Sequence, residues 1–352
     1  MNDSSNYSIV RREPQHVDQL NKMYADVFGA ELYDKSLKRW NWQYLDNPGI
    51  GKSEPAIWVA VQGDVVLGQL ATMEFPMWWG DHEVQASAAM DYMVRNEARG
   101  RGIGIALTEA WLDHVDVGLG LGLTPSSYAL FRKTMTDVGP VPSYLRILDS
   151  KMFARHRLGW FLGTITAPFL KMALHFTVSP AAQETNLNVR MVSDFSKDYD
   201  DLWLRVRGSY AAIVRRDSNY LNWKYIRCPF RSYRIYEART AEMLSGYIVT
   251  RTEGDPSFQR GIIVDLFCDP QDTATTAALV EIAMNNFQSI GVARVETYCL
   301  DTRLIHSFKQ LGFRAGRTTT QYCVSHRRIS SAPLTRQSEW NLMLGDGDLD
   351  RA

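Results

Sequence analysis

Three glycines and three arginines fall within ten residues of the segment AAMDYMVRNEARGRGIGIALTEA, residues 88–110. A largely apolar stretch predicts a strand here, and apolar residues at helical spacing predict a helix that begins near Gly104. A glycine-rich turn between a strand and a helix directs several backbone N–H groups to one point, where the helix dipole adds positive charge. Arg95, Arg99 and Arg101 add full charges. The segment therefore predicts an anion site suited to a pyrophosphate; a turn carrying solvated arginines is the alternative.

This spacing differs from that of other ligand-binding motifs. No Gly-Lys-Ser/Thr follows the glycines, as a Walker loop requires, and they do not follow the dinucleotide-binding pattern GxGxxG. The cysteines form no CxxC pair and no Cys/His cluster with zinc spacing, so we predict no metal site. The four cysteines are Cys228, Cys268, Cys299 and Cys323. The simplest interpretation is that they are reduced thiols of a cytoplasmic protein.

The composition of the 352-residue chain excludes several classes of protein. It is 45% hydrophobic and 22% charged, which excludes a disordered chain. The 39 basic and 39 acidic residues balance, which argues against a nucleic-acid binder. We find no signal-peptide pattern at the start, and no stretch of about 20 apolar residues that would predict a membrane-spanning helix.

Two segments of the chain resemble each other. NWQYLDNP, residues 41–48, is matched by NWKYIRCP, residues 222–229. A predicted hairpin follows each segment, and a short apolar run holding one acid comes next, with Asp91 in the first run and Asp265 in the second. Because the offsets agree, we infer a duplicated α/β unit of roughly 150 residues.

The repeat divides the chain into four parts. We predict an N-terminal domain at 1–150, a helical connector at 151–185, a degenerate second domain at 186–330 and a tail at 331–352. The connector contains an apolar run that basic residues precede. A helix packed between the domains is our first interpretation, and an interfacial membrane anchor is the alternative.

The glycine-rich segment resembles the Arg/Gln-x-x-Gly-x-Gly/Ala signature of GCN5-related N-acetyltransferases (GNATs), which bind the acetyl-CoA pyrophosphate at this loop. Near the end of the second copy, the residues from Asp301 to Gly312-Phe313 resemble a further motif of that family. The resemblance implies an α/β (α+β) fold of two tandem acyl-CoA N-acyltransferase-like domains, each a mixed, mostly antiparallel sheet flanked by helices. It also implies that acetyl-CoA is held by Met93, Val94, Arg99, Gly100, Arg101, Gly102, Ile103 and Gly104.

The two copies differ at this loop. When they are aligned, Thr273 lies opposite Arg99, and the sequence TATTAALV that follows has no glycine. Side chains there would close the phosphate site. We therefore predict that only the N-terminal copy binds CoA.

The catalytic groups are less distinct. Asp91 lies on the strand that would hold the pantetheine, and Glu74 lies on the neighbouring predicted strand; either is a candidate general base, with a structural carboxylate as the alternative. The family's usual acid, a tyrosine, is replaced here by Phe131, so Tyr128 one helical turn earlier is the candidate acid. The pair Trp78-Trp79 has no counterpart in the second copy and is a candidate substrate wall, with core packing as the alternative.

The resemblance implies an acetyl-CoA-dependent N-acyltransferase that acts on a small-molecule amine, such as an amino sugar of surface-polysaccharide biosynthesis. The alternatives are a CoA- or acyl-carrier-binding regulatory or assembly protein without catalysis, and an acyltransferase that uses longer acyl chains. We expect no nucleic-acid partner, and membrane association only if the connector is an anchor.

Overall fold

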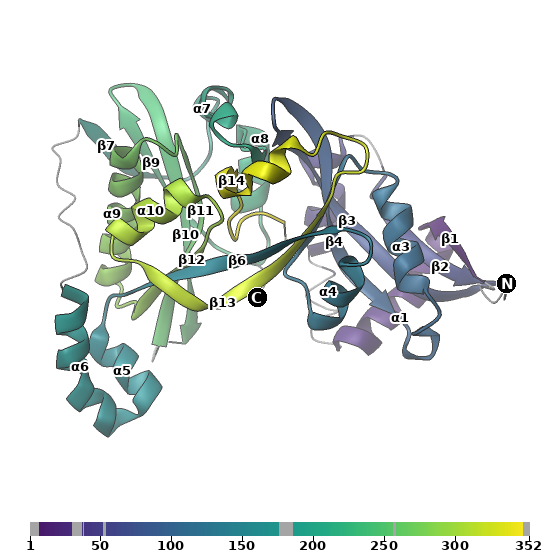
Figure 1. Ribbon diagram of the computed structural model, residues 1–352, viewed down its shortest axis with the longest axis horizontal. Helices are drawn as coiled ribbons and strands as arrows, with labels where there is room; N and C mark the ends of the chain where they lie inside the picture. Colours follow the sequence, from purple (N-terminus) through teal and green to yellow (C-terminus); the bar gives the residue numbers. More distant parts are fainter. Residues whose placement is uncertain are drawn as a thin grey trace.

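The computed structural model describes residues 7–29, 37, 39–51, 54–175, 186–255 and 258–347, and in this part of the chain fourteen strands form one mixed sheet. Figure 1 shows the sheet running through both copies, with helices outside it. The first copy contributes β1 (Ser8–Arg11), β2 (Ile57–Gln62), β3 (Val65–Trp79), β4 (His82–Val94), β5 (Val117–Leu121) and β6 (Thr136–Ile147). The second contributes β7 (Leu187–Val192), β8 (Ala212–Val214), β9 (Arg234–Thr240), β10 (Met243–Asp255), β11 (Phe258–Cys268), β12 (Arg294–Tyr298), β13 (Arg314–Ser325) and β14 (Trp340–Asn341).

The α-helices cover the sheet and join the copies. They are α1 (Val17–Phe28), α3 (Ile103–Leu112), α4 (Pro125–Phe131), α5 (Ser150–Leu158), α6 (Trp160–His175), α7 (Asp198–Val206), α8 (Ser218–Leu221), α9 (Thr273–Ser289) and α10 (Thr302–Gln310). Leu107, Trp111 and Phe131 pack α3 and α4 on one end of the sheet, and Leu279 and Phe308 pack α9 and α10 on the other. Each copy thus buries one sheet face under its own helices.

The last strands of the two copies are exchanged. β13 lies between β5 and β6 and pairs antiparallel with both, while β6 also pairs with β12 of the second copy. β6 and β13 have equal lengths and begin 178 residues apart, which is close to the offset of the repeat. Each copy therefore completes its sheet with a strand from the other, and the crossing strands are visible at the centre of Figure 1.

The repeated NWxY segments meet where the two copies face each other. Each forms one π-helical turn, at Asn41–Leu45 and Asn222–Ile226. The Trp42 indole N–H donates to the Trp223 carbonyl at 2.8 Å, and the Trp223 indole N–H donates to the Trp42 carbonyl at 2.7 Å. The rings stack with centroids 4.8 Å apart, and both are buried. The reciprocal bonds satisfy both indole donors inside the apolar cluster that the copies share.

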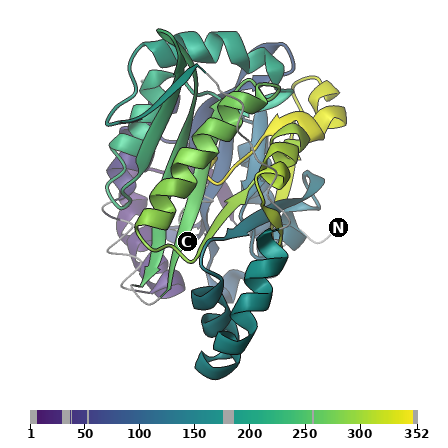
Figure 2. The same cartoon turned by 90° about the vertical axis from the view of Figure 1, so that its left-hand side faces the viewer.

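The connector forms a helical hairpin, α5 and α6, in its described part; residues 176–185 lie outside the described residues. The hairpin does not lie between the copies. Figures 1 and 2 show it projecting from the end of the second copy, beyond the rest of the molecule. In the part of the chain that the structure describes, no helix combines the length and apolarity needed to cross a membrane.

The tryptophan pair gives a direct test of how the copies are held together. Trp223→Ala removes a fully buried ring and leaves the Trp42 carbonyl without its donor, so we expect a loss of about 3–5 kcal/mol in the free energy of unfolding. Urea unfolding measures this. Trp160→Ala, at a site 71% exposed, is the control and should change stability little. A loss of similar size in the two variants would contradict the assignment.

Candidate functional site

The glycine-rich loop joins β4 to α3. Gly100 and Gly102 have φ values of 80° and 82°, and Gly102 is the N-cap of α3. Side chains are strained in this left-handed region, so these two positions require glycine. The first helical hydrogen bond of α3 runs from the Ala106 N–H to the Gly102 carbonyl. The N–H groups of residues 103–105 therefore precede the ladder and point outward at the helix start, as an anion site requires.

The three arginines of the loop have different environments. The Nε of Arg95 donates to the Val66 carbonyl at 2.6 Å and fastens the loop to the β2–β3 hairpin. Arg101 donates to the Gln62 side chain at 3.1 Å. Arg99 is exposed, and its side chain has no hydrogen bond or ion pair within the described residues. Arg99 is thus the cation best able to turn toward a ligand at the start of α3.

Gly104 has a packing role. A Cβ there would come within 2.5 Å of Leu130 and 2.7 Å of the Tyr92 hydroxyl, which donates to the Gly104 carbonyl at 2.7 Å. Burial raises the pKa of Tyr92 to about 12, so the phenol stays protonated as a donor. Gly104 lets the first turn of α3 lie against β4, which fixes where the open N–H groups point.

Beside this loop, β4 and β5 separate. These parallel strands pair only from Ala86 to Ala88, against Val117 to Leu119. The following half of β4, which carries Met93 and Val94, continues without pairing to β5. An extended ligand can lie along a strand edge of this kind, with its phosphates at the α3 N-terminus.

In the second copy β11 and β12 also separate, after Ile262 and Glu296, but the C-terminal segment enters the space. The Gly345 N–H donates to the Val264 carbonyl at 2.8 Å, and the Asn341 side chain donates to the Leu266 carbonyl at 3.3 Å. The segment is buried there, and its buried residues include Trp340, Leu342, Met343 and Leu344. The chain itself thus covers the β11 edge.

The helix start in the second copy is also satisfied internally. Asp272 is the N-cap of α9, and its carboxylate accepts from the Thr275 N–H at 2.9 Å and from the Thr275 hydroxyl at 2.7 Å. A capping carboxylate occupies an N–H group that an anion would need and adds negative charge. The second copy therefore lacks both of these features of the first, the open strand edge and the uncapped helix start.

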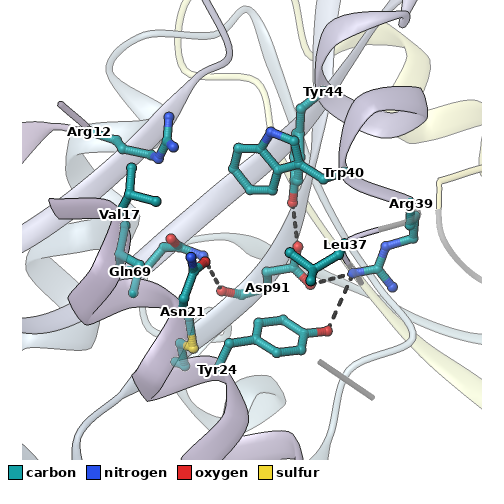
Figure 3. A pocket seen from close by; sticks show the side chains of 12 residues that line it. Arg12, Val17, Asn21, Tyr24, Leu37, Arg39, Trp40, Tyr44, Gln69 and Asp91 are labelled. Carbon is teal, nitrogen blue, oxygen red and sulfur yellow. Dashed lines mark hydrogen bonds and ion pairs between the residues drawn. The ribbon is translucent and has the colours of Figure 1, made fainter. Parts of the chain in front are cut away.

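Asp91 lies at a β-bulge in β4, where Ala71 pairs with Met90 and Gln69 pairs with Met93. Its φ of 42° is unusual for a non-glycine residue. Figure 3 shows its carboxylate between Arg39, which donates at 3.0 Å, and Tyr44, whose hydroxyl donates at 2.5 Å. The bulge turns the carboxylate toward the α1 side of the sheet.

The carboxylate borders a cavity of about 180 Å³ between α1 and the sheet (Figure 3). Its polar and aromatic lining includes Arg12, Asn21, Tyr24, Arg39, Trp40, Tyr44, Gln69 and Asp91. Burial opposes the charge of Arg39, but Asp91, Tyr44 and Tyr24 together outweigh it and raise the Arg39 pKa. The Arg12 guanidinium lies 4.9 Å from the Trp40 ring centroid. The cavity thus offers charged groups of both signs beside an aromatic face.

The second copy repeats the arrangement around Asp265. Arg216 lies 3.2 Å from one carboxylate oxygen, and Tyr225 and Tyr247 each donate to the other at 3.0 Å. Asp346 of the C-terminal segment binds Arg216 as well, at 2.8 Å, and the Arg216 and Asp265 side chains are 1% exposed. The same group that borders a cavity in the first copy is sealed in the second.

Sequence reasoning missed both arginines. Tyr44 and Tyr225 occupy equal positions in the repeat, and the two aspartates were matched, but Arg39 precedes Asn41 by two residues whereas Arg216 precedes Asn222 by six. No shared spacing marked them. In the sequence, only the matched tyrosine and aspartate of each copy indicated this carboxylate site.

Glu74 and Asp91 are not brought together. Side chains alternate along β3, and the neighbours Met73 and Phe75 lie in the core cluster that contains Met90, so Glu74 faces the opposite side of the sheet. Burial raises the pKa of Glu74, while Arg11 acts in the opposite direction. Glu74 therefore lies on the face of the sheet away from the cavity, and its role as a base stays a prediction.

The remaining candidates lie near α4 and in the core. The Tyr128 hydroxyl donates to Asp137 at 2.6 Å, and this bond raises the Tyr128 pKa. Phe131 is buried and stacks on Tyr92 with centroids 5.7 Å apart. Trp79 is fully buried against Trp340 and lines the core. No group of three or more potential metal ligands occurs among the described residues.

Comparison with known proteins agrees with this geometry. Residues 9–134 match the family model described as an acetyltransferase (GNAT) domain. The chain is similar to a GCN5-related N-acetyltransferase from Anabaena variabilis, at 15% identity and a TM-score of 0.62 over 91% of this chain and 72% of that one. It is also similar to Saccharomyces cerevisiae N-myristoyltransferase with bound myristoyl-CoA, at 10% identity and 0.54 over 94% and 85%. No curated protein sequence matches significantly.

A third similar structure is a probable N-acyltransferase from Enterococcus faecalis, at 10% identity and a TM-score of 0.61 over 90% of this chain and 72% of that one. The predicted resemblance and the predicted fold class are therefore confirmed. Residues 9–134 thus match a GNAT acetyltransferase domain, and the chain as a whole has the mixed α/β fold seen in these N-acyltransferase structures.

The pKa of Glu74 leads to a prediction with a definite sign. Folding raises the pKa of Glu74. The protein therefore loses stability as the pH rises from the pKa of this acid in the unfolded chain, about 4.3, through its pKa in the folded protein. Glu74→Gln mimics the protonated form, so the variant should melt at the wild-type temperature near pH 4 and above it at pH 8. Thermal unfolding at the two pH values measures this. A difference independent of pH, or a less stable variant at pH 8, would contradict the assignment.

Proposed function

We propose that this protein is an acyl-CoA-dependent N-acyltransferase that transfers an acetyl group to a small-molecule amine. The carrying observation is the contrast between the copies. In the first, the β4 edge separates from β5 beside an uncapped α3, whereas in the second the C-terminal segment and Asp272 fill the equivalent positions. We therefore assign the acyl-CoA to the first copy only.

The loop residues fit a diphosphate. Arg99 and the N–H groups of residues 103–105 supply charge-assisted donors, and a Cβ at Gly100 would meet nothing within 4 Å. Bound acyl-CoA supplies an activated thioester to the reaction. The protein would orient the thioester along β4, where a backbone N–H near Val94 is the expected donor to its carbonyl oxygen.

The cavity at Asp91 fits the acceptor. Its carboxylate would attract an ammonium group, and the Arg39 Nε is buried without a hydrogen-bond partner among the described residues. An acceptor hydroxyl could satisfy that Nε, and Trp40 offers an aromatic surface for a sugar ring. We therefore favour an amino sugar, as in surface-polysaccharide biosynthesis.

In the reaction, the neutral amine nitrogen would form a bond to the thioester carbonyl carbon as the carbon–sulfur bond breaks. One amine proton must leave, and the thiolate can accept a proton. Asp91 is our candidate base, and it would exchange its bond from Tyr44 for one from the amine. Since the cysteines are free and buried, we expect this activity in the reducing cytoplasm.

The two matched aspartates provide the test. We expect thiol release from acetyl-CoA with at least one member of a panel of amino sugars, amino acids and polyamines. Asp91→Asn should lower kcat by about 10²–10⁴-fold. Asp265→Asn, the control, removes the equivalent carboxylate from the sealed site and should lower the melting temperature while kcat is retained.

Equal loss of kcat in both variants would show that Asp91 acts only through the fold. Binding of acetyl-CoA without thiol release across the whole panel would favour a regulatory or assembly protein instead. Faster release from long-chain acyl-CoA than from acetyl-CoA would overturn the choice of acetyl.

The phosphate site has its own test. Arg99→Glu reverses an exposed charge at the start of α3, so we expect CoA to bind at least tenfold more weakly by calorimetry. Arg328→Glu is the control because it makes the same change in charge near His114, beyond the far end of α3. Unchanged affinity in Arg99→Glu would contradict the assignment of the loop.

A further inference from the structure

The α5–α6 hairpin has an unusual distribution of charge. Residues 150–175 contain no Asp or Glu, and their cations are Lys151, Arg155, Arg157 and Lys171. Arg155 lies 5.5 Å from the Trp160 ring and donates to the Thr164 hydroxyl at 3.0 Å, while Arg157 lies 5.9 Å from the Phe153 ring. Neither arginine forms an ion pair within the described residues. The hairpin therefore carries an unbalanced positive charge.

Small residues form the contact between the two helices. A Cβ at Gly163 would lie 2.4 Å from the Cα of Arg155, so glycine is required for this approach. Ala167, one turn further along α6, is buried at 6% exposure. Because α6 packs through its small residues, its large apolar residues are left to point elsewhere.

Those large residues face solvent. Phe161, Ile165 and Phe169 are 66%, 52% and 67% exposed, and their spacing of four places them on one side of α6. Among the α6 side chains that the structure describes, the exposed large apolar ones are Trp160, Phe161, Leu162, Ile165, Phe169 and Met172. Soluble proteins rarely expose so many large apolar side chains together unless the patch binds something.

The position of the hairpin leaves this patch accessible. Figures 1 and 2 show α5 and α6 extending away from the sheet at the end of the second copy. α6 has 16 residues and is about 24 Å long, and it does not qualify as a membrane-spanning helix. A helix of this size with aromatic residues outward and Arg155 beside one of them, Trp160, has the features of a segment that lies in a membrane interface.

We propose that the α5–α6 hairpin docks the protein on the surface of an anionic lipid bilayer. The apolar face of α6 would enter the boundary between headgroups and acyl chains, and the basic residues would contact the anionic headgroups. Charge selects this occupant over a second copy of the chain, because a dimer through this face would bring two positive hairpins together. The inference rests on the hairpin alone and does not depend on acyl transfer.

The experiment is co-sedimentation of the full chain with vesicles. We expect binding to vesicles of 70% phosphatidylcholine and 30% phosphatidylglycerol, and at least tenfold weaker binding to pure phosphatidylcholine. The triple variant Trp160→Ser, Phe161→Ser and Phe169→Ser should bind the anionic vesicles at least tenfold more weakly. Its melting temperature should hold because all three side chains are exposed.

Two further variants complete the design. Lys151→Gln with Arg157→Gln should weaken binding to anionic vesicles and leave binding to neutral ones unchanged. Met191→Ser with Leu204→Ser removes exposed apolar side chains from β7 and α7 and should bind as the wild type does. No sedimentation with anionic vesicles, or equal sedimentation of the triple variant, would overturn the proposal. So would a wild-type dimer in solution that the triple variant converts to a monomer.

Discussion

The reciprocal hydrogen bonds between Trp42 and Trp223 are the contact on which the architecture depends. Each indole donates to the other's carbonyl, so the two bonds form only if the repeated turns face each other across a local two-fold relation. The same relation brings β6 and β13 side by side at the centre of the sheet. A duplicated sequence can meet both requirements at once, because any contact it makes in one direction it can also make in the other.

The two copies share this symmetric arrangement of strands but differ locally at their sites. Both retain a bulge in the strand that carries the aspartate (β4 and β11), a carboxylate with an arginine and a tyrosine, and a separation between two parallel strands. In the second copy the C-terminal segment fills the separation and adds Asp346 to the buried arginine. At the corresponding place in the first copy, where β4 and β5 separate, Gly347 of the C-terminal segment lies beside Leu121 and Ala88. The difference between the two sites thus comes from what fills the space and not from the sheet.

The sequence predicted features that depend on local pattern. The repeat, the glycine turn before α3 and the helical connector follow from spacing and composition, and Glu74 could have been assigned to its sheet face from the alternation of Met73 and Phe75. Strand exchange was not predicted, because the repeat locates the two strands but does not indicate the copy in which each one pairs. The bulge at Asp91 was missed because the residue pattern of the strand does not mark it, and the arginines at 39 and 216 because they stand at different distances from the repeated segments. The apolar run predicted a helix in the connector but not the direction of its large residues.

The exchange of β6 and β13 has a consequence for the evolution of the chain. A gene fragment ending after the first copy would encode a sheet that lacks β13, its penultimate strand, leaving the backbone of β5 and β6 unpaired at the middle. Such a fragment would have two strand edges with unpaired backbone N–H and C=O groups, which promote aggregation. The second copy can therefore lose any chemistry of its own and still be kept by selection, because its partner cannot fold to completion without it.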